Sequence, residues 1–160
     1  MEQTLVIVKP DAVARGLIGE VIRRFEAEGL VVCGLKMLWL GQKEAEGFYQ
    51  VHRQRPFFGS LTHFMASGPC VAMVLEGEEA IGRVRTLMGA TNPAEAAEGT
   101  LRRSFATSIE KNVVHGSDSA TSVAFEIPYF LIVWRFSPRS SGEGSVRRRG
   151  KRRVFCLKNP

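Results

Sequence analysis

The first apolar segment of the chain, residues 4–8, is an uninterrupted run of Thr, Leu, Val, Ile and Val. Runs of β-branched residues without polar alternation are typical of strands that are buried on both faces of a sheet. Two more apolar runs, residues 30–40 and 70–75, predict a second and a third strand. A shorter apolar stretch at residues 112–114 predicts a fourth strand, which delivers a histidine at its end.

Between these runs, apolar residues recur every three or four positions, which is the period of a helix that buries one face. This spacing predicts helices over residues 17–28, 57–66 and 80–88, and a shorter helix over residues 43–49. Another helix is expected to begin at residues 117–119. The Ser and Asp side chains there can accept hydrogen bonds from the first free amides of a helix.

With two helices set aside as insertions, the elements follow the order β-α-β-β-α-β. This order predicts an α+β fold of the ferredoxin-like type, an antiparallel sheet with helices packed on one face. A chain of 160 residues that is 44% apolar suits one domain with a substantial core. Residues 90–103 show no clear period, and irregular segments of this length often carry function.

The net charge of +6 is not spread over the chain. Residues 1–138 hold 14 Lys and Arg against 15 Asp and Glu, whereas residues 139–160 hold 8 Lys and Arg against a single Glu. We therefore predict a nearly neutral domain over residues 1–136 and a basic, disordered tail over residues 137–160. Such a tail is suited to nonspecific binding to nucleic acid or an acidic surface. A shifted reading frame or a cloning remnant would account for it equally well, and we expect the tail to have no part in catalysis.

The chain shows no sign of a membrane span or a secretion signal, and we expect it in the cytoplasm. Its three cysteines, Cys33, Cys70 and Cys156, lack metal-ligand or redox-motif spacing. They are interpreted as reduced thiols.

The segment 112–119, Asn-Val-Val-His-Gly-Ser-Asp-Ser, is the strongest candidate for chemistry. Its helix start offers free amides and a positive dipole end, which favour anions. Glu126 follows His115 by eleven residues, about three helical turns, so its carboxylate can fold back over the imidazole. A lone histidine beside a strand is as often a satisfied structural group, so this segment alone leaves both interpretations open.

Lys9, Arg85, Thr91 and Arg102 are candidates for binding phosphate. Taken singly, each is more often a solvated surface residue. The sequence contains no P-loop motif and no Gly-rich dinucleotide motif after the first strand. If phosphate binds, side chains must hold it.

Five segments of the chain share one family's order and spacing. They are residues 9–11 (Lys-Pro-Asp), 55–58 (Arg-Pro-Phe-Phe), 89–94 (Gly-Ala-Thr-Asn-Pro-Ala), 99–102 (Gly-Thr-Leu-Arg) and 112–119. In these segments the chain resembles the nucleoside diphosphate kinases, and the resemblance extends over roughly residues 3–130. One fragment would be weak evidence, whereas five in register indicate membership.

The resemblance implies a ping-pong transfer of the γ-phosphoryl of a nucleoside triphosphate, typically ATP, to a nucleoside diphosphate. His115 would carry the phosphoryl as a phosphohistidine. Glu126 would orient its ring with help from Ser117, Tyr49 would place its phenol near the moving group, and Lys9 would reach the terminal phosphate and the ribose.

The resemblance also implies a nucleotide-binding set. Phe57 would stack on the base with broad specificity. Phe57, Leu61 and Ile109 could equally be core residues, whereas Asn112 beside a buried strand needs a polar partner. The implied nucleotide-binding residues are Lys9, Phe57, Leu61, Arg85, Thr91, Arg102, Ile109 and Asn112.

Mg²⁺ is expected to enter with the nucleotide, since Asp118 and Glu126 are too few to form a dedicated metal site. The resemblance further implies a homo-oligomer, a tetramer or a hexamer. Besides the kinase, two hypotheses are open: a non-catalytic relative that binds nucleotides or partners, and a nucleic-acid-binding module driven by the tail.

The sequence departs from the family in two places. Ala12 stands where glycine usually follows Lys-Pro-Asp, which matters only if that position needs a positive φ. After about residue 130 no resemblance remains. The apolar run 130–136 is expected to pad the domain or a subunit contact.

Overall fold

The computed structural model describes residues 1–130 of the chain, and residues 131–160 lie outside this description. The predicted tail over residues 137–160 and the domain boundary at residue 136 therefore stay predictions. The elements are β1 (Glu2–Val8), α1 (Pro10–Ala14), α2 (Ile18–Ala27), β2 (Val31–Leu38), α3 (Gln42–Phe48), η1 (Gln50–His52), α4 (Phe58–Met65), β3 (Cys70–Gly77), α5 (Ala80–Met88), α6 (Leu101–Phe105), β4 (Val114–Gly116) and α7 (Ala120–Phe130).

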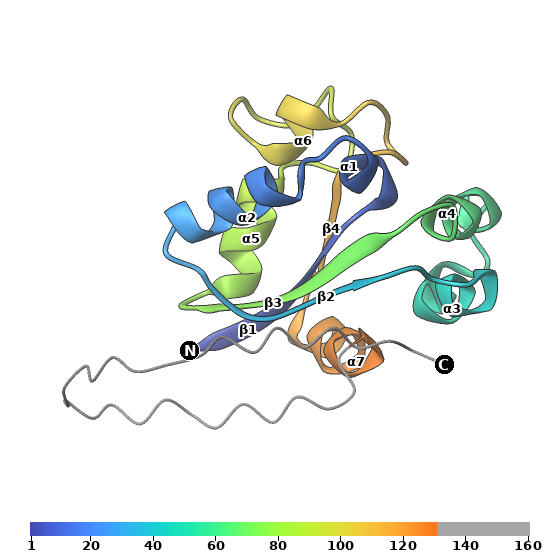
Figure 1. Ribbon diagram of the computed structural model, residues 1–160, viewed down its shortest axis with the longest axis horizontal. Coiled ribbons are helices and arrows are strands. Elements are labelled where there is room, and N and C mark those ends of the chain that lie inside the picture. The colour runs from blue at the N-terminus through green and yellow to red at the C-terminus, as the bar shows by residue number, and fades with distance from the viewer. Residues whose placement is uncertain (131–160) are drawn as a thin grey trace, which may run out of the picture.

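The four strands form one antiparallel sheet in the order β2-β3-β1-β4, which confirms the ferredoxin-like arrangement (Figure 1). β1 lies between β3 and β4, as its continuous apolar sequence predicts. Leu5 and Ile7 face one core cluster and Val6 and Val8 face the other, so both sides of this strand are buried.

Helices cover both faces of the sheet. The sequence had predicted helices on one face only. α2 and α5 pack on the face of Val6 and Val8. The second face is covered by α3, α4 and α7, whose apolar residues join Leu5 and Ile7. Figure 1 shows α5 above the sheet and α7 below it. The physical reason is that β1 has no polar face, so the sheet is stable only when both sides are covered.

Two local assignments differ from the sequence-based ones. The irregular segment 90–103 ends in a short helix, α6, which begins at Leu101 behind the side-chain cap of Thr100. The last strand is Val114–Gly116, so His115 lies within it rather than after it. Within the described residues, no helix has the length and apolarity that crossing a bilayer requires.

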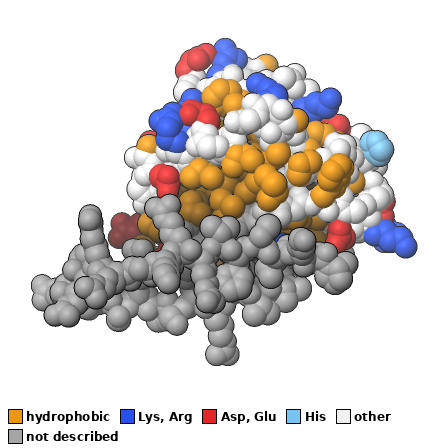
Figure 2. All heavy atoms as spheres, in the orientation of Figure 1, with side chains coloured by type: hydrophobic (Ala, Val, Ile, Leu, Met, Phe, Trp, Pro, Cys, Tyr) orange, Lys and Arg blue, Asp and Glu red, His pale blue; other side chains and the backbone are white. Residues whose placement is uncertain are grey.

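The edge strand β2 carries apolar side chains that the described residues leave half exposed. Leu35 and Met37 in this strand are 50% and 55% exposed, and Trp39, which follows the strand, is 66% exposed. Hydrophobic side chains gather over the middle of this face of the molecule (Figure 2). Exposed apolar patches of this kind mark interaction surfaces more often than isolated exposed residues do.

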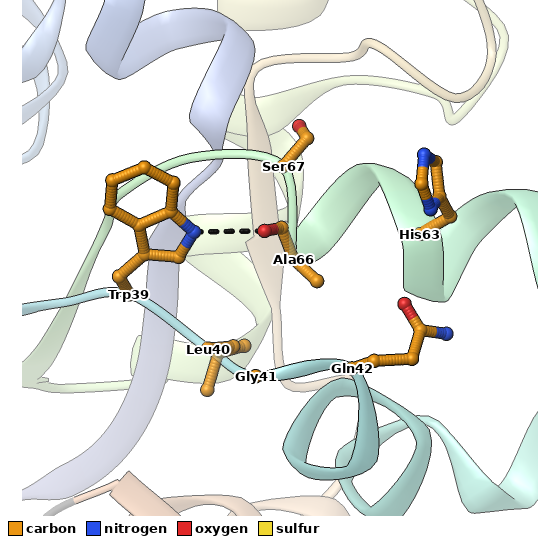
Figure 3. A pocket seen from close by; sticks show the side chains of 7 residues that line it. All are labelled: Trp39, Leu40, Gly41, Gln42, His63, Ala66 and Ser67. Carbon is orange, nitrogen blue, oxygen red and sulfur yellow. Dashed lines mark hydrogen bonds between the residues drawn. The ribbon is translucent and has the colours of Figure 1, made fainter.

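A cavity of about 680 Å³ lies where β2 leads into α3 and faces the end of α4. The indole N–H of Trp39 donates to the Ala66 carbonyl oxygen at 2.8 Å, which closes one side (Figure 3). The lining contains no Lys or Arg, so this cavity is not the phosphate site. Its lining residues are Trp39, Leu40, Gly41, Gln42, His63, Ala66 and Ser67.

Candidate active site

His115 is held by the short pairing of β4 with β1. It lies opposite Ile7 in the antiparallel register. A side chain at the next position would require Met88 to move, because a Cβ on Gly116 would lie 2.6 Å from the Met88 sulfur and 3.2 Å from Val84 Cγ1. The His115 side chain is 22% exposed, so the ring is reachable from solvent and not enclosed in hydrocarbon.

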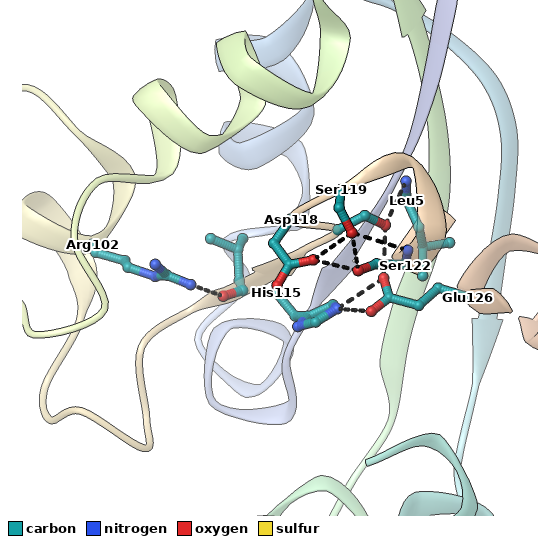
Figure 4. Close-up of polar contacts among 9 residues, drawn as sticks. Leu5, Arg102, His115, Asp118, Ser119, Ser122 and Glu126 are labelled. Carbon is teal, nitrogen blue, oxygen red and sulfur yellow. Dashed lines mark hydrogen bonds and ion pairs between the residues drawn. The ribbon is translucent and has the colours of Figure 1, made fainter. Parts of the chain in front are cut away.

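A chain of hydrogen bonds orients the His115 imidazole (Figure 4). Nε2 lies 3.0 and 3.1 Å from the two carboxylate oxygens of Glu126. The Ser117 hydroxyl donates to Glu126 at 2.7 Å, and the Leu5 N–H donates to Ser117 at 3.4 Å. A carboxylate only accepts, so Nε2 carries the hydrogen. In the neutral ring, Nδ1 then keeps its lone pair.

Aromatic rings form one wall of the site. The ring centroids of Phe48 and Tyr49 lie 5.3 and 5.9 Å from that of His115, each with an edge-to-face arrangement. The Tyr49 hydroxyl is buried without a hydrogen-bond partner among the described residues. Burial raises the pKa of Tyr49, so its phenol stays protonated and able to donate. An unpaired buried hydroxyl beside an imidazole suits an incoming oxygen.

Lys9 lies where β1 ends and α1 begins, and its ammonium group is buried. Nζ donates to Asn112 Oδ1 at 2.6 Å and to the Glu110 carbonyl oxygen at 3.4 Å. The amide of Asn112 in turn donates to the Thr91 carbonyl oxygen at 3.2 Å. Burial, followed by the nearby charge of Arg102, lowers the pKa of Lys9 to about 8.

Arg102 extends from α6 toward the same region. Its guanidinium donates to the carbonyl oxygens of Gly89 and Val114 at 2.9 and 3.0 Å, while Nε is buried without a partner among residues 1–130. Burial and the charge of Arg85 lower the pKa of Arg102 to about 10. The charge of Arg102 thus destabilises the charged form of Lys9, and the charge of Arg85 destabilises that of Arg102. An anion bound among these three side chains would relieve the repulsion.

The start of α7 is organised by Asp118. Ser119 and Ser122 donate their hydroxyls to its carboxylate, and these bonds hold the pKa of Asp118 below its usual range. Ser119 also accepts from the Ser122 N–H at 3.2 Å, as the predicted helix start requires.

The residues implied for base binding are mostly at the surface. Phe57 and Ile109 are 49% and 60% exposed, which excludes a core role for both. Leu61 packs partly against the core. The Phe57 ring lies 5.6 Å from that of His52, a residue that the sequence pattern had not marked. That Phe57 and Ile109 contact the same base stays a prediction.

One region of the fold holds the oriented His115 together with Lys9, Tyr49, Arg102 and Asn112. Comparisons with known proteins identify the family of the chain. The family model for nucleoside diphosphate kinase matches residues 2–133. The chain belongs to the nucleoside diphosphate kinase family. Two of the most similar relatives carry that name. They are the proteins of Desulfosudis oleivorans, 68% identical over 82% of this chain and 94% of the relative, and Desulforapulum autotrophicum, 63% identical over 82% and 95%.

Two solved structures of the family share the fold. A nucleoside diphosphate kinase from Encephalitozoon cuniculi is 37% identical, with a TM-score of 0.80, and the match covers 82% of this chain and 89% of that one. The Aquifex aeolicus enzyme is 46% identical, with a TM-score of 0.79, over 86% and 96% of the two chains.

The departure from the family at Ala12 is harmless to the fold. Ala12 lies within α1, where its N–H donates to the Lys9 carbonyl oxygen at 3.0 Å. It is not among the residues with positive φ, so this backbone position does not require glycine.

Proposed function

We propose that this family member performs the nucleoside diphosphate kinase reaction by a ping-pong mechanism through a phosphohistidine at His115. The γ-phosphoryl of a nucleoside triphosphate, typically ATP, would pass to the imidazole and then to a different nucleoside diphosphate. The observation that carries the proposal is the hydrogen bond between His115 Nε2 and the Glu126 carboxylate. This bond leaves Nδ1 as the nucleophilic nitrogen of a ring that is open to solvent.

The cations supply the stabilisation that phosphoryl transfer needs. Its transition state is loose and spreads charge over the equatorial oxygens, so catalysis depends on positioning and electrostatics. Lys9 would contact the terminal phosphate, and Arg85, Arg102 and Thr91 would hold the phosphate chain. The unpaired hydroxyl of Tyr49 would donate to an oxygen of the moving group.

The nucleoside would be held on the outer side of the phosphates. Asn112, already bonded to Lys9, would reach the ribose. The exposed ring of Phe57 would stack on the base, with Leu61 and Ile109 adding apolar contact. Stacking uses the face of the base and little of its edge, so we expect broad base specificity.

Mg²⁺ fits this site as a companion of the nucleotide. The described residues contain no group of three or more His, Cys, Asp or Glu side chains that could hold a metal by themselves. Glu126 is engaged with His115, and Asp118 accepts from two serine hydroxyls. Mg²⁺ needs few protein ligands when phosphate oxygens bind it, and when bound it neutralises the charge on those oxygens.

The alternative, a non-catalytic relative that binds nucleotides or partners, is less well supported. Binding of nucleotides or partners alone does not require the Ser117–Glu126–His115 hydrogen bonds together with a buried lysine. The nearly neutral charge of residues 1–138 likewise disfavours a specific nucleic-acid binder. A cytoplasmic location stays a prediction.

Determining which ring nitrogen of His115 carries the phosphoryl is a test of the mechanism. We expect the phosphoenzyme formed with ATP to show Nδ1-phosphohistidine in its ³¹P and ¹⁵N NMR spectra, because Nε2 is occupied by Glu126. Unphosphorylated enzyme under the same conditions is the reference. Phosphorylation at Nε2, or at a residue other than His115, would refute the assigned geometry.

We further propose that the exposed side of β2 is a contact between copies in the expected tetramer or hexamer. β2 is an edge strand, and its apolar Leu35 and Met37 are half exposed. An edge strand with uncovered apolar side chains favours pairing with another chain.

A charge on the exposed side of β2 should therefore prevent assembly. We expect Met37→Asp to give a smaller species than the unaltered chain in size-exclusion chromatography with light scattering. Val51→Asp places the same charge on another exposed apolar position, in η1, and serves as the control. An unchanged mass for the Met37 variant would place the contact elsewhere.

A further inference from the structure

Asp11, the acidic residue in the first turn of α1, contacts the backbone that leads to His115. Its Oδ2 atom accepts a hydrogen bond from the Val113 N–H at 3.1 Å. Its Oδ1 atom is buried and has no partner within residues 1–130. The carboxylate therefore binds a backbone amide of the segment that leads to His115.

Val113 has a backbone conformation that its side chain disfavours. Its φ is 74°, in the left-handed region, although valine is β-branched. The Val114 N–H donates to the Asn112 carbonyl oxygen at 2.8 Å, which closes a three-residue γ-turn of the strained type. Such conformations persist only where neighbouring groups hold them, and they cluster at functional sites.

The start of α1 holds both backbone groups of Val113. The Lys9 N–H donates to the Val113 carbonyl oxygen at 2.8 Å, and the Asp11 carboxylate accepts from the Val113 N–H. At the first residue of the turn, the Asn112 side chain accepts a hydrogen bond from Lys9 Nζ. His115 follows directly after the turn. The strained turn thus lies between the ribose-binding candidate and the nucleophile.

We propose that Asp11 is a positioning residue, whose carboxylate holds the left-handed turn at Val113 and thereby fixes Asn112 and His115 relative to Lys9. This inference rests on the proposed phosphohistidine mechanism. Without the carboxylate the turn relaxes, and the groups on either side move. A displacement of about 1 Å at the reacting atoms is sufficient to lower a rate by roughly 100-fold.

The charge of Asp11 provides a readout that a purely structural role would not affect. Three charged groups act on Lys9: Arg102 lowers the pKa of the lysine, whereas Asp11 and Glu110 raise it. Removal of the Asp11 charge should therefore lower the pKa of Lys9 further. The alkaline limb of the kcat/KM profile should then move to lower pH.

Two substitutions separate the hydrogen bond from the charge. In Asp11→Ala both are lost, and we expect kcat to fall roughly 100-fold. In Asp11→Asn the amide oxygen still accepts from Val113, so kcat should fall less, while the alkaline limb shifts in both variants. Glu20→Gln is the matched control, since Glu20 lies in the first turn of α2 and bonds only Arg23 and Arg24. It should leave kcat and the limb unchanged.

Soluble Asp11→Ala protein with kcat within about twofold of the unaltered enzyme would overturn the inference, and so would an alkaline limb that moves in neither variant. The rate of phosphoenzyme formation separates this failure from failure of the mechanism. If the unaltered enzyme forms no phosphohistidine, the proposed function fails. If it does and Asp11→Ala forms it at the same rate, only the positioning role fails.

Discussion

Replacement of His115 by alanine is expected to lower kcat by at least about 10⁴-fold, because the group that carries the phosphoryl is removed. The surrounding cations and the hydrogen bond from Ser117 to Glu126 would remain, but the imidazole that receives the phosphoryl would be gone. The measurement is steady-state transfer from ATP to a nucleoside diphosphate at saturating substrates. Nucleotide binding should change little, since the ring contributes mainly to the chemical step.

His63→Ala is the matched control for this substitution. His63 lies on α4, is exposed, and lines the cavity near Trp39 rather than the site. Its loss should leave kcat within about twofold of the unaltered value. Substantial transfer by His115→Ala protein would show that a different residue, or a direct transfer between nucleotides, carries the reaction.

Replacement of Lys9 by methionine is expected to have the second largest effect, a loss of roughly 10²–10³-fold in kcat/KM. The reason is that a buried cation is screened less by water, so it stabilises developing negative charge more strongly than a solvated cation does. Methionine keeps the apolar stem of the side chain, so packing at the end of β1 is preserved. The comparison of kcat with KM shows whether the loss occurs in the transition state or in ground-state binding.

The pH dependence of the unaltered enzyme should report the same residue. Because the pKa of Lys9 is lowered to about 8, the lysine loses its charge as the pH rises through that value. We therefore expect kcat/KM to fall above about pH 8, and this limb to be absent from the Lys9→Met variant. Bound phosphates favour the charged lysine, so the corresponding limb in kcat should lie at higher pH. A flat profile between pH 7 and 10 would contradict the assignment.

Much of the fold could be predicted from the sequence because the apolar pattern is strong. The run at residues 4–8 predicts a strand buried on both faces, and Leu5 and Val6 indeed face separate core clusters. The apolar pattern could not predict the face of the sheet on which α3 and α4 pack. Periodicity indicates that a helix has a buried side, whereas the sheet face that it meets depends on the path of the connecting chain.

The candidate site residues could be named from the sequence, but their geometry could not. The choice of ring nitrogen follows from how α7 brings Glu126 back to His115, and no spacing rule fixes it. The role inferred for Asp11 depends on a positive φ at Val113, and valine gives no sequence signal for that conformation. The exposure of Phe57 could not be separated from a core position by its helical spacing, because aromatic residues fill both kinds of position.

The most direct measurement of the central claim isolates the intermediate. The protein is incubated with ATP labelled at the γ-phosphoryl group, freed of nucleotide, and then given unlabelled GDP. A phosphohistidine at His115 predicts a label on the protein that is acid-labile and alkali-stable, and that passes completely to GTP within one turnover. Formation of labelled GTP without any labelled protein, or unchanged labelling of His115→Ala protein, would contradict the mechanism.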